Sequence, residues 1–134
     1  IKNSNIGKAS LDKLETINKK NIKNLTDREI ELKKNESDLK NKQNIISTDQ
    51  FNEEVNLLKE KIKLYNSEKD KMVNDFNKIK VEEINILMNK FNSVIQEYMD
   101  QNSIDVVLDK KNIFIGKVSS DITKIILEEI NIKF

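Results

Sequence analysis

The chain has 134 residues, of which 35% are charged and 37% hydrophobic, and its net charge is +1. The 24 basic and 23 acidic side chains are interleaved, which excludes the strongly basic surface typical of a dedicated nucleic-acid-binding protein. The sequence contains neither His nor Cys, so the commonest catalytic bases, thiolate nucleophiles and transition-metal ligands are excluded. We therefore expect neither an enzyme nor a cofactor or metal site.

A long first helix is predicted by the spacing of apolar residues and by the lack of helix breakers. The chain has no Pro and only two Gly, Gly7 and Gly116. One position repeats every seven residues, as Leu11, Asn18, Leu25, Leu32, Leu39 and Ile46. This spacing predicts a helix over about residues 7–45.

A turn at residues 46–50 and a second helix over about residues 50–100 are predicted next. Ser47 followed three residues later by Gln50 forms a capping-box pattern. The second helix has its own sevenfold series, Phe51, Leu58, Tyr65, Met72, Ile79 and Ile86. If the chain folds back near Thr48, the two series face each other, from Ile46 opposite Phe51 to Leu11 opposite Ile86. This arrangement is an antiparallel helical hairpin.

The remaining residues predict a small sheet and a final helix. Runs rich in β-branched residues at about 104–109 and 113–116 predict two strands joined by a short turn. Ser119, Ser120 and Asp121 supply N-caps for a helix over about residues 121–131. The predicted fold is mostly α with a small β part, a single domain over residues 1–134. In it a long antiparallel helical hairpin stands on a small β-sheet base that also carries the C-terminal helix. Two strands alone are marginal in water, so this base is expected to need another strand or other subunits.

In this order, the segments resemble the Skp/OmpH family of periplasmic chaperones from Ser4 to Asn131. The matching pieces are residues 4–9, the heptads from Leu25 to Leu39, residues 96–98, residues 106–110, Asn112-Ile113, Asp121-Ile122-Thr123, Leu127 and Ile130-Asn131. The strand segment and the Asp-Ile-Thr segment contribute most, because any long helix can imitate heptads.

The resemblance implies a homotrimer with three helical arms around a cavity. It also implies an ATP-independent holdase in the periplasm, which binds unfolded outer-membrane proteins and prevents their aggregation. The family usually has a strand before the segment that matches Ser4 to Ala9, whereas this chain begins at Ile1. We therefore expect the signal peptide and the first strand to be absent from this chain.

Lysines near the predicted turn are the candidate client-binding residues. We expect them to attract acidic clients, with peripheral contact with anionic lipid as a further role. The alternative is a salt-bridged solvated surface, because Glu36, Asp38, Glu53, Glu54 and Glu60 lie among them. The candidates are Lys33, Lys34, Lys40, Lys42, Lys59, Lys61 and Lys63.

Three other interpretations remain open. A structural coiled-coil tether would present a seam to a partner helix and would have no β base. A prefoldin-like chaperone would carry its β-hairpins between the two long helices, whereas here the predicted strands follow both. An enzyme would need a concave polar pocket built without His or Cys.

Overall fold

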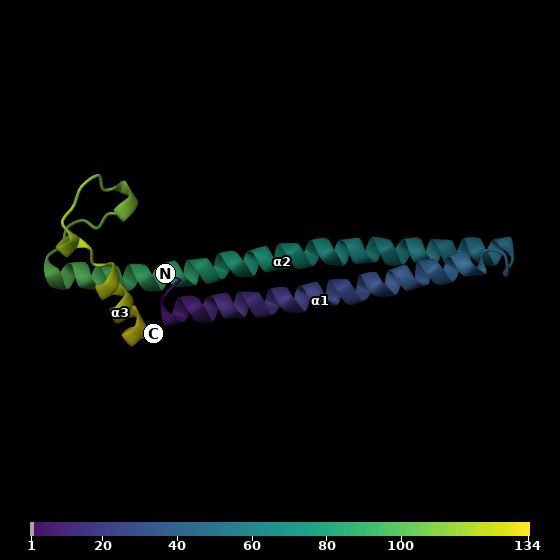
Figure 1. The fold of residues 1–134 in the computed structure, drawn as a ribbon, viewed down its shortest axis with the longest axis horizontal. Coiled ribbons are helices and arrows are strands. Elements are labelled where there is room, and N and C mark those ends of the chain that lie inside the picture. The colour runs from purple at the N-terminus through teal and green to yellow at the C-terminus, as the bar shows by residue number, and fades with distance from the viewer. Residues whose placement is uncertain (1) are drawn as a thin grey trace. The chain divides into compact units, whose positions relative to one another are not determined.

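The structure is a computed structural model that describes residues 2–134. Its long helices are α1 (Asn5–Lys42) and α2 (Thr48–Asn102), and a shorter helix, α3 (Thr123–Lys133), ends the chain (Figure 1). Single 3₁₀ turns at Lys110–Asn112 and Val118–Ser120 lie between α2 and α3. The chain divides into two compact units. We call Glu15–Ile79 the hairpin unit, and Ile1–Leu14 with Lys80–Phe134 the terminal unit.

The hairpin unit consists of two antiparallel helical segments joined by a tight turn. α1 ends at Lys42, whose carbonyl accepts hydrogen bonds from the amides of Ile45 and Ile46. The capping box predicted at the start of α2 is confirmed. The Ser47 hydroxyl accepts from the Gln50 amide at 3.3 Å, and the Gln50 side-chain oxygen accepts from the Ser47 amide at 3.3 Å. The reciprocal pair satisfies two amides that a helix start leaves unbonded.

The predicted sevenfold series is covered from Leu25 to Ile46 and from Phe51 to Ile79, but over residues 65–90 of α2 the covered positions follow an eleven-residue repeat. On α2, the positions turned away from solvent between residues 65 and 90 are Tyr65, Glu68, Met72, Phe76, Ile79, Glu83, Leu87 and Lys90. Eleven residues in three turns is close to the 3.6 residues per turn of a straight helix, so the contact needs little left-handed supercoiling. The predicted facing pair at the end of the series, Leu11 and Ile86, is therefore wrong. Their side chains are 48% and 50% exposed, and their neighbours Ser10 and Leu87 take the inner positions.

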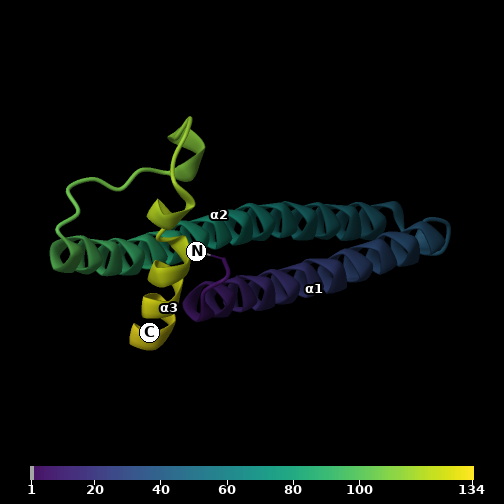
Figure 2. The same cartoon turned by 60° about the vertical axis from the view of Figure 1, so that its left-hand side comes forward.

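The hydrophobic core of the terminal unit lies where α3 crosses the last part of α2 (Figures 1 and 2). Phe91 and Val94 of α2 pack with Ile126 and Ile130 of α3. Partly buried side chains surround this cluster, namely those of Ile6, Ile95, Tyr98 and Ile122. The start of α1 is thus held in the same core as the end of the chain.

Polar contacts join the two ends of the chain within the terminal unit. The amide of Asn5 donates to the Asn131 side chain at 2.8 Å, and Lys133 pairs with Glu97. Ser4 is fully buried, and its hydroxyl accepts from the Gly7 amide at 3.1 Å, which caps α1.

The predicted β-sheet base is wrong, because residues 2–134 contain no strand. The segment at 104–109 ends in extended backbone at Asp109, and Ile113 is extended as well. Between them, however, the Asp109 carboxylate accepts from the Lys111 amide at 3.1 Å and caps a 3₁₀ turn. This turn replaces the tight hairpin turn that would bring 104–109 and 113–116 into register. β-Branched residues favour extended backbone, but they do not supply a partner strand.

The last helix begins slightly later than its predicted caps. Helical residues start at Thr123, and the residue before them, Ile122, makes no side-chain cap. Asp121 supplies the bond instead, since its carboxylate accepts from the Thr123 amide at 3.1 Å. It also pairs with Lys110 at 3.0 Å. Hydrogen bonds from Thr123 and Lys110 lower the pKa of Asp121 to about 2.

Candidate functional site

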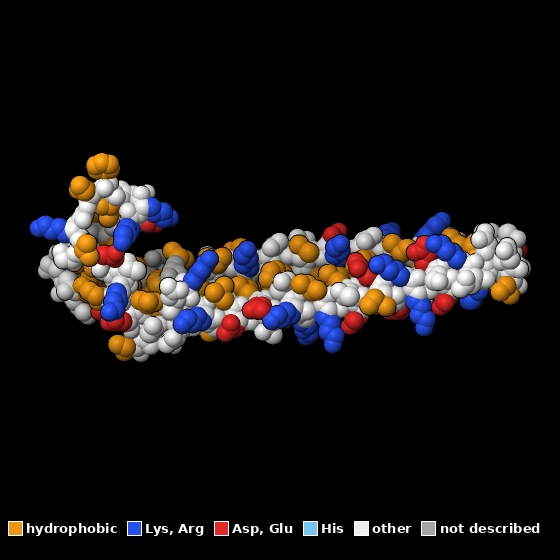
Figure 3. Space-filling view, in the orientation of Figure 1, with side chains coloured by type: hydrophobic (Ala, Val, Ile, Leu, Met, Phe, Trp, Pro, Cys, Tyr) orange, Lys and Arg blue, Asp and Glu red, His pale blue; other side chains and the backbone are white. Residues whose placement is uncertain are grey.

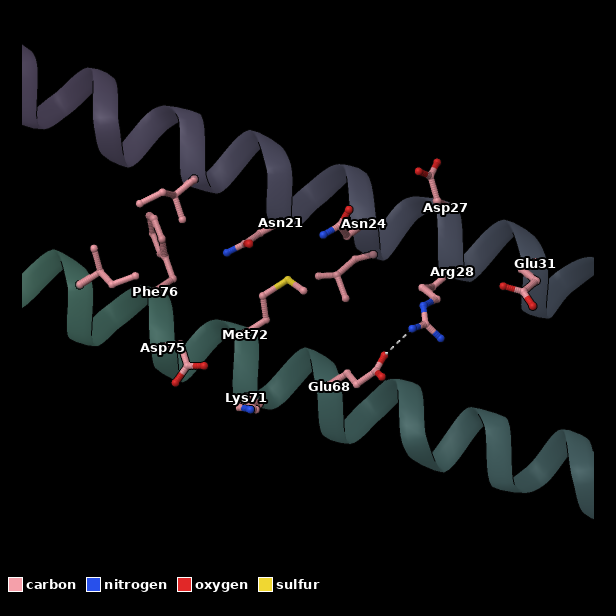
Figure 4. A pocket seen from close by; sticks show the side chains of 13 residues that line it. Asn21, Asn24, Asp27, Arg28, Glu31, Glu68, Lys71, Met72, Asp75 and Phe76 are labelled. Atoms are coloured by element: carbon pink, nitrogen blue, oxygen red, sulfur yellow. Dashed lines mark ion pairs between the residues drawn. The ribbon is translucent and has the colours of Figure 1, made fainter.

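A groove of about 740 Å³ lies between the two helices of the hairpin unit. Figure 4 shows Met72 and Phe76 projecting from α2 into the space between the helices, with Asn21 on the α1 side. The full lining is Ile17, Asn21, Asn24, Leu25, Asp27, Arg28, Glu31, Glu68, Lys71, Met72, Asp75, Phe76 and Ile79. We call this hollow the interhelical groove.

The floor of the interhelical groove is apolar and only partly covered. Met72, Phe76 and Ile79 are half-buried although they lie on the inner face of α2. Opposite them, α1 presents Asn21 and Asn24 where a tightly packed helix pair would have larger apolar side chains. These short polar side chains leave the floor open to solvent.

Two polar interactions between the helices stand beside the groove. Arg28 pairs with Glu68 at 3.5 Å (Figure 4). The buried Tyr65 donates its hydroxyl to Glu29 at 2.6 Å, and this hydrogen bond raises the pKa of Tyr65. The tyrosine therefore stays a neutral donor at physiological pH and ties the helices together next to the groove.

Further apolar side chains lie exposed on the hairpin unit. Figure 3 shows hydrophobic side chains along the line where the two helices meet, with charged side chains on either side. The exposed large apolar residues are Ile22, Ile30, Ile45, Leu57, Ile62, Leu64 and Val73.

The seven predicted client-binding lysines are all exposed on the hairpin unit, but the structure does not gather them into one site. Lys40 pairs with Glu36 at 3.0 Å on its own helix, and Lys42 pairs with Glu54 at 3.0 Å between helices. Lys33, Lys34, Lys59, Lys61 and Lys63 make no ion pair within residues 2–134. None of the seven lines the interhelical groove.

Two of these lysines do share a smaller hollow closer to the turn. Lys42 and Lys61 line a space of about 350 Å³ together with the apolar residues Leu39, Leu57 and Leu58. The role of the seven lysines in binding stays a prediction.

A second exposed apolar surface lies between α2 and α3, in residues 104–118. Phe114 and Val118 are almost completely exposed, and Ile115 is mostly so. Its other exposed apolar residues are Val106, Val107, Leu108 and Ile113. We call this the connecting segment.

Sequence reasoning missed both the interhelical groove and the exposed character of the connecting segment. The sequence did carry a signal for the groove, because Asn18, Asn21 and Asn24 interrupt the apolar face of α1. For the connecting segment, the choice between strand and loop could not be decided from β-branched content alone.

No three His, Cys, Asp or Glu side chains in residues 2–134 are placed to hold a metal ion. None of the helices in the same residues is long and apolar enough to cross a membrane. The geometry of the hairpin unit provides apolar surface bordered by charge.

Comparison with known proteins gives the same fold and identifies the family. A solved structure of a candidate OmpH-like outer membrane chaperone from Caulobacter crescentus CB15 superposes with a TM-score of 0.93 at 19% identity. The match covers 98% of this chain and 78% of that chain. No curated protein matches the sequence. The profile of the OmpH family, described as outer membrane protein (OmpH-like), matches residues 1–130, and the chain therefore belongs to the OmpH-like family.

Proposed function

We propose that the protein is an ATP-independent holdase of the periplasm, which binds unfolded outer-membrane proteins and prevents their aggregation. The observation that carries this proposal is membership of the OmpH-like family over residues 1–130. The Caulobacter protein with the same fold is described as a candidate outer membrane chaperone. No chemical step is required of a holdase, which agrees with the apolar and charged surface of the hairpin unit.

The hairpin unit supports the proposal through the distribution of its apolar side chains. Residues such as Ile30, Leu64 and Val73 are about half exposed, so their side chains are open to contact with a client. Each contact with an unfolded client removes a small apolar area from water, worth about 25 cal/mol per Å². Many such contacts on several linked hairpins raise the effective concentration of binding surface without holding any client segment tightly. A client held in this way is released when it folds or finds a stronger partner.

We further propose that the protein works as a homotrimer and that the connecting segment takes part in the association. Phe114, Ile115 and Val118 form an exposed apolar surface on a chain whose terminal unit has a small core. Burying that surface against other copies would remove it from water. The seven lysines of the hairpin unit remain proposed contacts for acidic clients and for anionic lipid.

A structural tether is the second candidate function. The observation that favours it is the lack of a sheet in residues 2–134, since a tether is expected to have no β base. Against it, the sevenfold series from Phe51 to Ile79 is partly or fully buried and does not lie on an exposed face of α2.

The test is light scattering from a denatured outer-membrane β-barrel protein diluted into buffer with and without this protein, in the absence of nucleotide. The holdase proposal predicts that scattering is suppressed at a stoichiometry matching the oligomer measured by sedimentation. A folded oligomer that leaves scattering unchanged would favour the tether.

Matched variants connect the activity to the hairpin unit. Replacing the exposed Ile62, Leu64 and Val73 by Ser is expected to weaken suppression. The control replaces three exposed asparagines of the same helix by Ser, which leaves the apolar surface unchanged, and it should retain full activity. These asparagines are Asn56, Asn66 and Asn74.

A further inference from the structure

The interhelical groove combines an apolar floor with an acidic rim. Four carboxylates and two cationic groups line it, which gives a net charge of −2. Arg28 forms an ion pair with Glu68, so Lys71 is the one cation of the rim without an ion pair in the described residues. Asp27, Glu31 and Asp75 likewise have no cationic partner within 4.0 Å in residues 2–134.

The negative charge of the rim is local and does not follow from the chain as a whole. The protein carries a net charge of +1, so its long-range field does not attract cations. Asp27 and Glu31 lie one turn apart on α1, where like charges repel each other. A cationic group at the rim would relieve this repulsion, whereas an anionic group would add to it.

The size of the groove fits a short stretch of extended polypeptide. Its lining on α1 runs from Ile17 to Glu31, which corresponds to about 21 Å along a helix. An extended chain advances about 3.3 Å per residue, so about six residues span that length. The half-buried Met72 and Phe76 on the floor are adaptable and aromatic partners for apolar side chains.

We propose that the interhelical groove binds extended client segments in which a few apolar residues are flanked by Arg or Lys. The apolar residues cover the floor at Met72, Phe76 and Ile79, while one cation lies against Glu31 at the end of the groove and another reaches Asp75 at its side (Figure 4). This inference rests on the proposed holdase function and adds to it a sequence preference. The groove is thus expected to prefer basic client segments, whereas the lysines near the turn are expected to prefer acidic ones.

The experiment measures fluorescence anisotropy of labelled eight-residue peptides that share a central apolar run and differ only in their ends. One peptide ends in Arg, one in Gln and one in Glu. At low ionic strength the intact protein is expected to bind the Arg-ended peptide roughly fivefold more tightly than the Glu-ended one, as two exposed charge contacts allow. Added salt should remove most of this preference, because exposed charges are screened.

The decisive variant reverses two rim charges, Glu31→Lys with Asp75→Lys, and is expected to abolish or invert the preference. The matched control is Glu60→Lys with Asp70→Lys, which makes the same change of net charge at exposed positions outside the groove. Circular dichroism verifies that both variants keep their helices. Equal affinity for the three peptides, or a preference that survives in the rim variant, would overturn the inference.

Two further readouts distinguish client binding in the groove from holdase activity elsewhere on the chain and from self-association. Light scattering with the denatured β-barrel protein tests the holdase function itself. If aggregation is suppressed but the peptides show no preference, client binding in the interhelical groove is refuted and the holdase proposal is not. Sedimentation tests whether the groove holds a second copy of this chain. A rim variant that loses its oligomeric state while the control keeps it would assign the groove to self-association and overturn client binding there.

Discussion

Glu83 is the least exposed carboxylate among the ion pairs of the terminal unit, with 13% of its side chain accessible. It accepts a hydrogen bond from the Ser10 hydroxyl at 2.9 Å and forms an ion pair with Lys13. The hydrogen bond from Lys13, followed by that from Ser10, holds the pKa of Glu83 below its ordinary value. This one side chain therefore joins the first turns of α1 to α2 more strongly while it is ionised.

We predict that Glu83→Gln lowers the urea midpoint of unfolding at neutral pH. Because the pKa of Glu83 is lowered on folding, its contribution is fully present above the ordinary glutamate pKa of about 4.3. It is lost as the pH falls through the lower value of the folded state, so the variant and the original protein should converge in acid. Far-UV circular dichroism in urea, repeated from pH 7 down to acid, measures both midpoints.

The matched control for this prediction is Glu82→Gln. Glu82 is the exposed neighbour and makes no ion pair within residues 2–134, so its replacement should leave the midpoint unchanged. If Glu83→Gln lowers the urea midpoint by the same amount at every pH, the contribution of this side chain to stability comes from its packing and not from its ionisation.

At the scale of the element, α3 is held by two buried side chains on one face. Ile130 is completely buried, whereas Ile132 on the same helix is 87% exposed. We predict that Ile130→Ala lowers the free energy of unfolding by about 2–4 kcal/mol, because it removes buried methyl groups and leaves a cavity. Ile132→Ala makes the same chemical change on the outer face of α3 and should change the free energy of unfolding by less than about 0.5 kcal/mol.

Urea unfolding followed by circular dichroism measures this difference, and hydrogen exchange locates it. Loss of protection in α3 and at Phe91 and Val94 is expected for Ile130→Ala alone, since these residues form one cluster. Equal effects of the two substitutions would contradict the packing described for α3.

The elements that the sequence predicts well are those whose stability is local. The two long helices follow from apolar spacing and the absence of Pro, and Leu39 and Tyr65 of the sevenfold series are buried. The same series fails at Leu11 and Ile86, because a strict seven-residue repeat drifts around a straight helix by about 20° per heptad. Short-range patterns predict the helix but not which side of it is buried over its whole length.

The sheet and the site could not be predicted in the same way. Residues 104–109 have the composition of a strand, yet a strand exists only when another segment pairs with it. The interhelical groove depends on Asn21 and Asn24 lying opposite Met72 and Phe76, which requires the register between helices. Family membership, in contrast, is predicted from ordered short segments and is confirmed over residues 1–130.

At the scale of the whole molecule, the proposed self-association should depend on the connecting segment. We predict that replacing Phe114 and Val118 by Ser lowers the sedimenting mass toward that of one chain while helical content is unchanged, because both side chains lie outside the core. The control replaces Ile45 and Leu57, which are exposed on the hairpin unit, by Ser. If both double variants sediment like the original protein, the connecting segment is not the association surface.

The bond between the Asn5 amide and the Asn131 side chain joins residues 126 positions apart in the chain. Contacts of such long range form late, because the entropy of closing the intervening loop must be overcome first. The helices within Glu15–Ile79 meet through a short turn, so they can pair while the last residues are still emerging from a ribosome or a translocation pore. Pulsed hydrogen exchange during refolding should accordingly protect that unit before Phe91 and Val94. A newly made chain thus passes through a stage in which the helices of the hairpin unit are formed while Ile130, which completes the core, has not yet arrived.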